Sequence, residues 1–314
     1  MTEPADRYAG AHVLVTGATG FIGAHLAAAL AQAGARVEGV ARRRPDTPLQ
    51  GCTVLHTADL ADLTQCRALI RSVQPDYIFH LASHVAGRQD LATVLETFTA
   101  NLAASVNLFT AAAELGKPKS IVVAGSSEEP RQFTLADPET APTSPYAAAK
   151  LGQSAYAAFF RRTLGLPISH ARIFMCYGPA QRDSKKLVPY VTLSLLRGQS
   201  PALASGRRLA DWTYVGDVVD GLVRLGQRPD VVSLEIGSGR LTSVGDIALK
   251  LRDIIDPAAK IAFGAEADRL HEPQRFADIA QSLALVGWRP EVGLDDGLRR
   301  TVDWYRAARD ELNR

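Results

Sequence analysis

A run of glycines directly after the first apolar stretch constrains the fold of this 314-residue chain more than any other feature. A strand is expected at residues 12–16 (HVLVT), and Gly17, Gly20 and Gly23 follow it, immediately before an alanine-rich helical stretch. Gly17 and Gly20 allow the backbone to turn sharply and approach a diphosphate, and Gly23 allows the helix to pack close to the strand. Because a helix N-terminus attracts anions, the turn predicts a dinucleotide-binding loop rather than an ordinary tight turn.

Beyond this turn, short β-rich runs alternate with helical stretches. The apolar runs are RVEGVA, TVLH, DYIFHLA, SIVVAGSS and ISHARIF, and regular alternation ends near residue 174, after which prolines punctuate shorter elements. Repeated strand and helix indicate a parallel sheet covered by helices on both faces. We therefore expect an α/β protein with a doubly wound parallel sheet in residues 1–174, joined by residues 211–236, and a smaller mixed α/β substrate-binding lobe in residues 175–210 and 237–314.

Composition and charge exclude several classes of function. Lysine and arginine exceed aspartate and glutamate by only 2, so no overall basic field would hold nucleic acid or an anionic membrane. The three cysteines, Cys52, Cys66 and Cys176, match neither metal-binding pairs nor a disulfide framework and suit a reducing cytoplasm. No apolar run approaches the roughly 20 residues that span a bilayer, and the N-terminus lacks the order of a secretory signal. We expect a cytoplasmic protein with no metal, nucleic-acid or membrane partner.

The end of the second expected strand bears on the choice of dinucleotide. NAD-binding sites commonly place an acid there to bind the ribose hydroxyls, but this chain has Ala41, followed by Arg42, Arg43 and Arg44. A guanidinium group can bind a ribose 2′-phosphate through paired, charge-assisted hydrogen bonds. The sequence therefore favours NADP over NAD, with a solvated basic turn as the alternative.

A tyrosine and a lysine are candidates for acid–base chemistry. Tyr146 and Lys150 are four residues apart, so they share one face of a helix expected to begin near Ser144, close to Ser126 at a strand end. A nearby ammonium and a cationic nicotinamide would bring the pKa of the phenol towards neutrality, so that it can act as general acid or base. Ser126 could bind the same substrate oxygen. On spacing alone, a surface pair is the alternative.

The order of these segments resembles that of the extended short-chain dehydrogenases, the NAD(P)-dependent epimerase/dehydratase family. VTGATGFIG, Asp59-Leu60, HLAS, Asn101, the strand end at Ser126, YAAAK and ARIFMCYGP follow the family's order over nearly the whole chain. The resemblance implies a Rossmann domain, a homodimer, and Tyr146, Lys150 and Ser126 as catalytic residues. Together with the glycine turn and the arginines, it gives these cofactor contacts: Gly17, Thr19, Gly20, Phe21, Ile22, Gly23, Arg42, Arg43, Asp59, Leu60, Leu81, Ala82, Ser83, Tyr146 and Lys150.

The second half resembles the family members that act on nucleotide sugars. KKLVPYVTLSLLRGQSPALASG and ADRLHEPQRFADIAQSLALVGWRP look like their substrate-binding segments, which implies a nucleoside diphosphate sugar as partner. The implied substrate contacts are His84, Ser127, Glu128, Lys186, Leu187, Pro201, Leu203 and Arg269. Three departures from the family pattern predict an unusual substrate pose. Met175 stands where the family often has Asn, and Ala210 stands where it often has Arg. Glu129-Pro130-Arg131 stands where the family often has an aromatic–glycine pair.

The resemblance leaves several reactions open. Arg42 favours a reductase, because a reductase must exchange its spent NADP for NADPH at every turnover, whereas most members that recycle their cofactor use NAD. The segment from Ser126 to Glu129 resembles both GDP-mannose 4,6-dehydratases and 4-keto-6-deoxy-sugar reductases. The favoured reading is NADPH-dependent reduction of a 4-keto-6-deoxy nucleotide sugar at C4, with Tyr146 as general acid. Glu128 aligns with the base of the dehydratases, so 4,6-dehydration or epimerisation is the alternative. A non-sugar carbonyl reductase and a non-catalytic NADPH sensor are further hypotheses.

Overall fold

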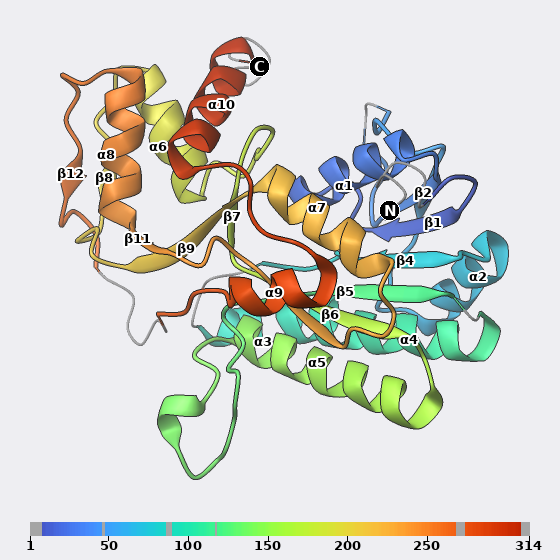
Figure 1. The fold of residues 1–314 in the computed structure, drawn as a ribbon. Coiled ribbons are helices and arrows are strands. Elements are labelled where there is room, and N and C mark those ends of the chain that lie inside the picture. Colours follow the sequence, from blue (N-terminus) through green and yellow to red (C-terminus); the bar gives the residue numbers. More distant parts are fainter. Residues whose placement is uncertain (1–7, 46–47, 86–89, 117, 268–273, 309–314) are drawn as a thin grey trace. The chain divides into compact units, whose positions relative to one another are not determined.

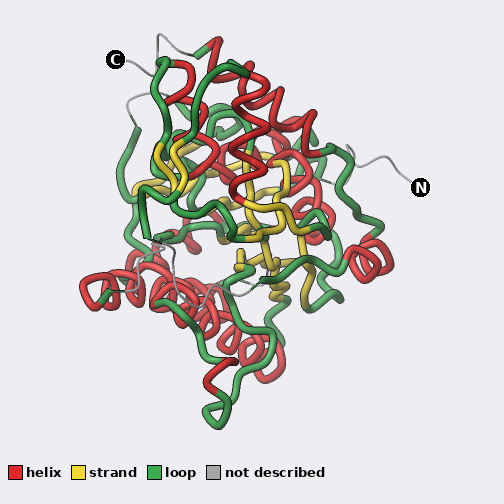
Figure 2. Tube along the Cα trace, turned by 90° about the vertical axis from the view of Figure 1, so that its left-hand side faces the viewer, coloured by secondary structure: helices red, strands yellow, loops and turns green. Residues whose placement is uncertain are grey.

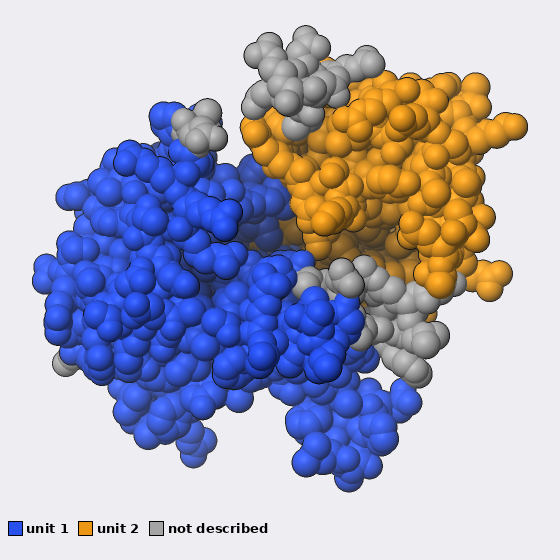
Figure 3. Space-filling view, turned by 180° about the vertical axis from the view of Figure 1, so that it is seen from behind, with its two compact units in different colours: residues 1–173, 219–235, 281–288 blue, residues 174–218, 236–280, 289–314 orange. Residues whose placement is uncertain are grey.

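The chain divides into two compact units. The structure, a computed structural model, describes residues 8–45, 48–85, 90–116, 118–267 and 274–308. The first unit comprises residues 1–173, 219–235 and 281–288, and the second comprises residues 174–218, 236–280 and 289–314 (Figure 3).

The first unit is built on a seven-stranded sheet in the order β10-β6-β5-β4-β1-β2-β3 (Figure 1). Every neighbouring pair from β6 to β3 is parallel, and the order winds outward from β1 in both directions. This confirms the predicted Rossmann-like, doubly wound sheet. The strands are β1 (His12–Thr16), β2 (Arg36–Ala41), β3 (Val54–Thr57), β4 (Tyr77–His80), β5 (Ser120–Ser126), β6 (Ile168–Ile173) and β10 (Ser233–Ile236).

Helices cover the sheet of the first unit on both faces. The main ones are α1 (Phe21–Gln32), α2 (Leu63–Val73), α4 (Ala104–Leu115) and α5 (Pro145–Leu164), with shorter η2 (Leu91–Thr93), α3 (Val94–Thr97), η3 (Phe98–Ala103, a π-helix) and η4 (Pro138–Thr140). Buried side chains of α2, α4 and α5 form one cluster with Leu14, Ile78 and Ile121 of the strands. All seven residues of β5 are buried, as expected for a parallel strand covered on both faces. Figure 2 shows the helices packed against the strands.

Sequence signals at both ends fix the helix that carries the tyrosine and the lysine. The side chain of Ser144 caps α5 by accepting a hydrogen bond from Ala147 N at 3.0 Å, and Pro145 occupies the first turn. Gly165, with φ of 70°, ends the helix in the left-handed conformation. These signals place Tyr146 and Lys150 in the first turns of α5.

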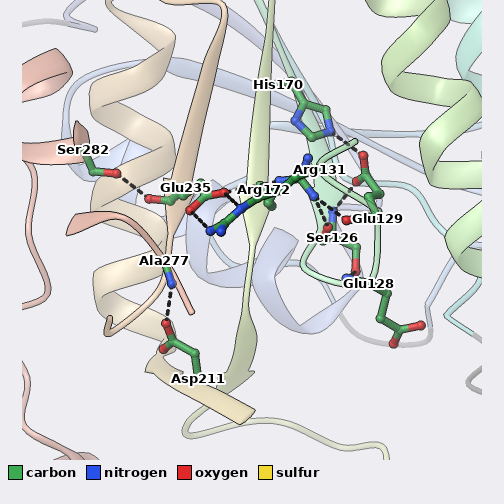
Figure 4. Close-up of polar contacts among 10 residues, drawn as sticks. All are labelled: Ser126, Glu128, Glu129, Arg131, His170, Arg172, Asp211, Glu235, Ala277 and Ser282. Atoms are coloured by element: carbon green, nitrogen blue, oxygen red, sulfur yellow. Dashed lines mark hydrogen bonds and ion pairs between the residues drawn. The ribbon is translucent and has the colours of Figure 1, made fainter. Parts of the chain in front are cut away.

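The second unit has a small sheet of its own, in the order β11-β9-β7. Its elements are β7 (Met175–Tyr177), α6 (Leu187–Leu196), β8 (Ala202–Leu203), β9 (Leu209–Tyr214), β11 (Leu241–Ser243), α8 (Val244–Ile255), β12 (Ala262–Phe263) and α10 (Leu294–Ala307). Trp212 is buried in its core, and the indole N–H donates to Thr242 O at 3.0 Å. Asp211 accepts a hydrogen bond from Ser238 N. It accepts another from Ala277 N, which Figure 4 shows.

The boundary between the units differs from the expected one. Because β9 pairs with β7 and β11, residues 211–218 cluster with the second unit, and the chain rejoins the first unit only at residue 219. The crossing lies within α7 (Val215–Gly226), and α9 (Ile279–Val286) brings residues 281–288 into the first unit. Among the described helices, none is both long and apolar enough to cross a membrane.

Candidate active site

The glycine turn after β1 leaves no room for side chains. Gly17 has φ of 69°, and a Cβ there would lie 2.7 Å from Ala82 N, in the segment that follows β4. A Cβ on Gly23 would collide with the carbonyl oxygen of Gly17. Because these glycines have no side chains, the turn can pack closely against the start of α1 and the residues Leu81 to Ser83.

The N-terminus of α1 is open to an anion. Gly20 precedes the helix and offers no side-chain cap, and the first turn carries no acidic residue. Thr19 and Gly20 are exposed, and Phe21 and Ile22 are half-buried. The free N–H groups and the positive end of the helix dipole fit a dinucleotide diphosphate.

The predicted contacts for the adenosine half lie at the ends of β2 and β3. Arg42 and Arg43 are exposed directly after Ala41, the last residue of β2. Asp59 is exposed, and its carboxylate accepts a hydrogen bond from Ala61 N at 3.0 Å. The side chain of Leu60 is buried in the core of the first unit, so mainly its backbone is available to a cofactor.

Tyr146 meets two serines from different strand ends. Its side chain is hydrogen-bonded to those of Ser126, at the end of β5, and Ser83, after β4. Ser83 was predicted only as a cofactor contact, so its position beside the tyrosine was missed. Burial raises the pKa of Tyr146, the nearby Glu128 raises it further, and the hydrogen bonds from the two serines act in the opposite direction. The protein's own groups thus do not give the near-neutral pKa expected from the sequence.

Lys150 is held beside the tyrosine by two acceptors. Its Nζ donates to Ala124 O at 2.7 Å and to Gln153 Oε1 at 3.1 Å. The ammonium lies 5.9 Å from the centroid of the Tyr146 ring. Burial lowers the pKa of Lys150 to about 8, which leaves a mixture of ammonium and amine in the physiological range.

A buried polar chain links Lys150 to the strand before the glycine turn, and the sequence did not reveal it. Gln153 Nε2 donates to Ser105 Oγ at 2.6 Å, and Ser105 Oγ lies 2.8 Å from His80 Nε2. The other ring nitrogen of His80 lies 2.7 Å from Thr16 Oγ1. Burial lowers the pKa of His80 to about 3, so this residue is neutral. The only sequence signal is the helical spacing of Lys150 and Gln153 in one alanine-rich segment, with Ser105 in another.

Asn101 fixes the segment that carries two predicted site residues. Its Oδ1 accepts from Ser83 Oγ at 3.0 Å and from His84 N at 2.6 Å, and its Nδ2 donates to His84 O at 3.0 Å. Asn101 is fully buried in η3. The imidazole of His84 is 30% exposed and lies 3.6 Å from Glu96.

Glu128 lies at the edge of the tyrosine site. Its backbone N–H donates to Ser126 Oγ at 3.1 Å, and its carboxylate accepts from Ser144 Oγ at 3.4 Å. Ser127 and Glu128 are half-buried, and Ser127 N donates to Ile173 O at 3.0 Å. Figure 4 shows the side chain of Glu128 pointing away from Glu129. A carboxylate, a phenol and a hydroxyl thus lie together at the carboxyl end of β5.

The remaining predicted substrate contacts belong to the second unit. Lys186 precedes α6, whose N-terminus has neither a side-chain cap nor an acid in its first turn, and Leu187 is half-buried. Leu203 is buried in the core of this unit, and Pro201 is buried with its carbonyl bound to Ala262 N at 2.9 Å. Arg269 lies outside the described residues. Within the described residues, no group of His, Cys, Asp and Glu is arranged to hold a metal ion.

Comparison with known proteins identifies the family. Residues 13–237 match the model of the NAD dependent epimerase/dehydratase family. The chain is 30% identical to a probable dTDP-glucose 4,6-dehydratase of Sinorhizobium fredii, over 93% of this chain and 92% of the relative. It is 28% identical to a UDP-glucose 4-epimerase of Mycolicibacterium smegmatis, over 93% and 98%.

A solved structure supports the same assignment. An NAD-dependent NDP-hexosamine 5,6-dehydratase of tunicamycin biosynthesis superposes with a TM-score of 0.80 at 30% identity, covering 95% of this chain and 98% of that protein. The Rossmann-like sheet, the glycine turn and the tyrosine–lysine pair are in keeping with these matches. The chain belongs to the NAD dependent epimerase/dehydratase family, whose members of the extended short-chain dehydrogenase type include epimerases and dehydratases of nucleotide sugars.

Proposed function

We propose that this protein is a nucleotide-sugar dehydratase that removes water across C5 and C6 of a hexose after oxidising its C4 hydroxyl. The observation that carries the proposal is the carboxylate of Glu128 beside Tyr146 and Ser126. An epimerase of this family requires only oxidation and re-reduction at C4. An elimination also needs a group that removes a proton from carbon, and Glu128 supplies one.

Oxidation at C4 uses Tyr146 and its neighbours. When bound, the nicotinamide cofactor would take up the hydride from C4 and, after the elimination, would return it either to C6, giving a 4-keto-6-deoxy sugar, or to C4, giving an unsaturated sugar. Tyr146 takes the proton of the C4 hydroxyl, while Ser126 holds the same oxygen by a hydrogen bond. The Lys150 ammonium stabilises the phenolate electrostatically, because both groups are buried and the field between them is weakly screened.

Elimination then follows from the acidity next to the new ketone. The C4 carbonyl acidifies the C5 hydrogen, which the Glu128 carboxylate removes as a proton. The C5–C6 double bond forms as the C6–O bond breaks, and the departing hydroxide takes the proton from Glu128 and leaves as water. A single acid–base group is sufficient for both proton transfers.

We also propose which cofactor and which class of substrate the protein binds. Arg42 and Arg43, exposed at the end of β2, support a preference for NADP over NAD. The open N-terminus of α6 beside Lys186 supports a nucleoside diphosphate as the handle of the sugar. Exposed apolar side chains on α3, η3 and α5 support a homodimer.

Net reduction by NADPH was the favoured interpretation of the sequence, with epimerisation or 4,6-dehydration as the alternative. The relatives above are named as an epimerase and dehydratases, which supports the alternative over the reductase. The similarity to two dehydratases, each at 30% identity, agrees with a role for Glu128 in elimination.

The fate of a C4 deuterium tests the proposal. We would supply purified protein and catalytic NADP with a panel of nucleoside diphosphate hexoses deuterated at C4. Dehydration should give a 4-keto-6-deoxy sugar with deuterium at C6, or an unsaturated product with loss of water. A C4 epimer that retains the deuterium at C4 would show that the protein is an epimerase and not a dehydratase. Conversion only of 4-keto sugars, with stoichiometric use of NADPH, would restore the reductase.

Glu128→Gln separates the two chemical stages. The variant should lose water elimination by about 10²- to 10⁴-fold, since it lacks the base. Oxidation at C4, followed by the absorbance of reduced nicotinamide, should persist. Glu139→Gln, in an exposed turn, is the matched control. Equal losses of both stages in Glu128→Gln would contradict the assigned role.

A further inference from the structure

The segment after Ser126 departs from the extended short-chain dehydrogenase pattern at Glu129, Pro130 and Arg131. The side chain of Glu129 is 0% exposed, at the end of the strand that carries Ser126. Burying a carboxylate is unfavourable unless charged and hydrogen-bonding partners surround it. The contacts of Glu129 therefore indicate what it does for the site.

Glu129 reaches back to the backbone of Ser126. Its carboxylate accepts a hydrogen bond from Ser126 N at 2.5 Å, and its other oxygen lies 3.2 Å from His170 Nε2 (Figure 4). A Cβ on Gly125 would lie 2.6 Å from this carboxylate and would collide with the His170 ring. The glycine thus opens the space in which the carboxylate meets the strand end.

A second layer of charge holds the same turn in place. Arg172 Nη1 donates to Glu129 O at 2.7 Å and to Ser126 O at 3.3 Å. Its Nε lies 3.6 Å from Glu235, which also accepts two hydrogen bonds from Arg131, at 2.9 and 2.7 Å. Side chains from β6 and β10 therefore fix the backbone from Ser126 to Arg131, and Figure 4 shows them as one cluster.

The charge of Glu129 also acts on the catalytic lysine. Lys150 Nζ binds the carbonyl of Ala124, two residues before Ser126 on the same strand. Burial lowers the pKa of Lys150, and the negative charge of Glu129 raises it. Burial likewise raises the pKa of Glu129, but His170, Arg172 and the N–H of Ser126 outweigh this and keep it below its ordinary value. Glu129 is thus an anion at neutral pH. The titratable or charged groups around this pair are Tyr146, His80, His170 and Arg172, with Glu128 near Tyr146 and Arg131 bound to Glu235.

We propose that Glu129 is a positioning residue of the active site, which orients Ser126 through its backbone N–H and provides a counter-charge that stabilises the ammonium form of Lys150. The effect on turnover rests on the proposed function. The effect on Lys150 does not, because it exists in the protein without substrate. His170 and Arg172 support Glu129 rather than the reaction.

Two substitutions separate the two roles. Glu129→Gln retains an oxygen that can accept from Ser126 N but removes the charge. Glu129→Asp retains the charge but withdraws the oxygen by one methylene group. Glu235→Gln removes a carboxylate of the same cluster that binds Arg131 and lies near Arg172, and it is the matched control.

The titration of Lys150 is measured directly by NMR of protein labelled with ¹³Cε-lysine, with the signal assigned from Lys150→Met. In Glu129→Gln the midpoint should move down by about one pH unit, because an opposing charge is lost. It should stay in place in Glu129→Asp and Glu235→Gln. Since the ammonium is present below its pKa and is lost as pH rises, activity of Glu129→Gln should fall off at lower pH than that of the unmodified protein.

Turnover tests the orientation of Ser126. Glu129→Asp should lower kcat several-fold while the substrate KM and the alkaline limb of the pH profile stay unchanged. An unchanged Lys150 midpoint in Glu129→Gln would overturn the counter-charge role, and an unchanged kcat in Glu129→Asp would overturn the orienting role. If Glu129→Gln does not fold, a lowered midpoint in Glu129→Asp would also contradict the counter-charge. A shifted midpoint in a protein inert towards all nucleotide sugars would overturn the proposed function alone.

Discussion

Tyr146 is the proposed acid–base group, and its removal is the most direct test of the mechanism at the scale of single residues. Tyr146→Phe should lower turnover by about 10²- to 10⁴-fold, because it deletes the proton donor and acceptor. Cofactor affinity, measured by fluorescence titration, should be nearly unchanged.

Tyr156→Phe is the matched control for this prediction. It removes the same hydroxyl from an exposed position on the same helix, and its activity should match that of the unmodified protein. Near-normal activity of Tyr146→Phe would show that the tyrosine takes no part in the proton transfer.

Arg42 tests the cofactor. Arg42→Ala should reduce the preference for NADP over NAD by roughly 10- to 150-fold in the ratio of Kd values, since hydrogen bonds to charged groups contribute about 1.5–3 kcal/mol. Arg44→Ala, which changes an exposed arginine two residues on, should leave the ratio nearly unchanged. Equal affinities for the two cofactors in the unmodified protein would disprove the NADP assignment.

The sequence predicted the proximity of Tyr146 and Lys150 better than it predicted the groups around them. Tyr146 and Lys150 are neighbours on one helix, so spacing alone predicts that they share a face. Ser83 and Ser126 follow different strands, and only the strand order of the sheet brings both to the tyrosine. The contact between Gln153 and Ser105 joins residues 48 apart in the chain, and no local pattern encodes it.

At the scale of elements, the close approach of α1 to the turn after β1 depends on Gly23. Gly23→Ala should destabilise the protein by about 1–3 kcal/mol, because its Cβ would meet the Gly17 carbonyl oxygen and shift the helix start. Dinucleotide binding should weaken with it. Both effects are measured by thermal unfolding with and without cofactor.

The control for this element uses a glycine in open space. Gly293 precedes α10 with φ of −64°, and a Cβ there would meet nothing within 4 Å. Gly293→Ala should therefore change stability little. If Gly23→Ala were as harmless, the turn would tolerate more movement than the structure indicates.

Elements with strong local signals were predicted well. The runs HVLVT, RVEGVA and TVLH correspond to β1, β2 and β3, because apolar stretches bounded by glycines or polar turns encode strands of a parallel sheet. β1 and β2 are largely buried, whereas β3 at the sheet edge is partly exposed. The helical segment that contains Asn101 is interrupted by the π-helix η3. Asn101 lies in this irregular turn and binds the segment at Ser83 and His84, a tertiary contact that helical periodicity does not encode.

At the scale of the whole molecule, the second unit was harder to predict than the first. Its strands are short, and β9 joins a separate small sheet instead of returning to the large one. The sequence of residues 211–217 (DWTYVGD) fits either arrangement, since its pairing partners and not its composition decide which sheet a short strand joins. The role of this unit in binding the nucleotide remains a prediction.

The first unit also presents a surface suited to a second copy of the chain. Leu95 on α3 is 76% exposed and Phe98 on η3 is 50% exposed, while Phe159 on α5 is 48% exposed. These segments pack together, with Gly152 of α5 leaving space for the Leu102 side chain. Exposed apolar side chains on adjoining helices favour association, because pairing removes them from water.

We therefore expect a homodimer in which α3, η3 and α5 of one protomer pack against those of the other. Leu95→Glu or Phe159→Glu should shift the protein from dimer to monomer in sedimentation velocity, since either change buries an unpaired charge in the interface. Leu135→Glu, in the loop before α5 and 92% exposed, should leave the dimer intact. A monomeric unmodified protein, or a dimer that tolerates both charges, would show that this apolar face has another role.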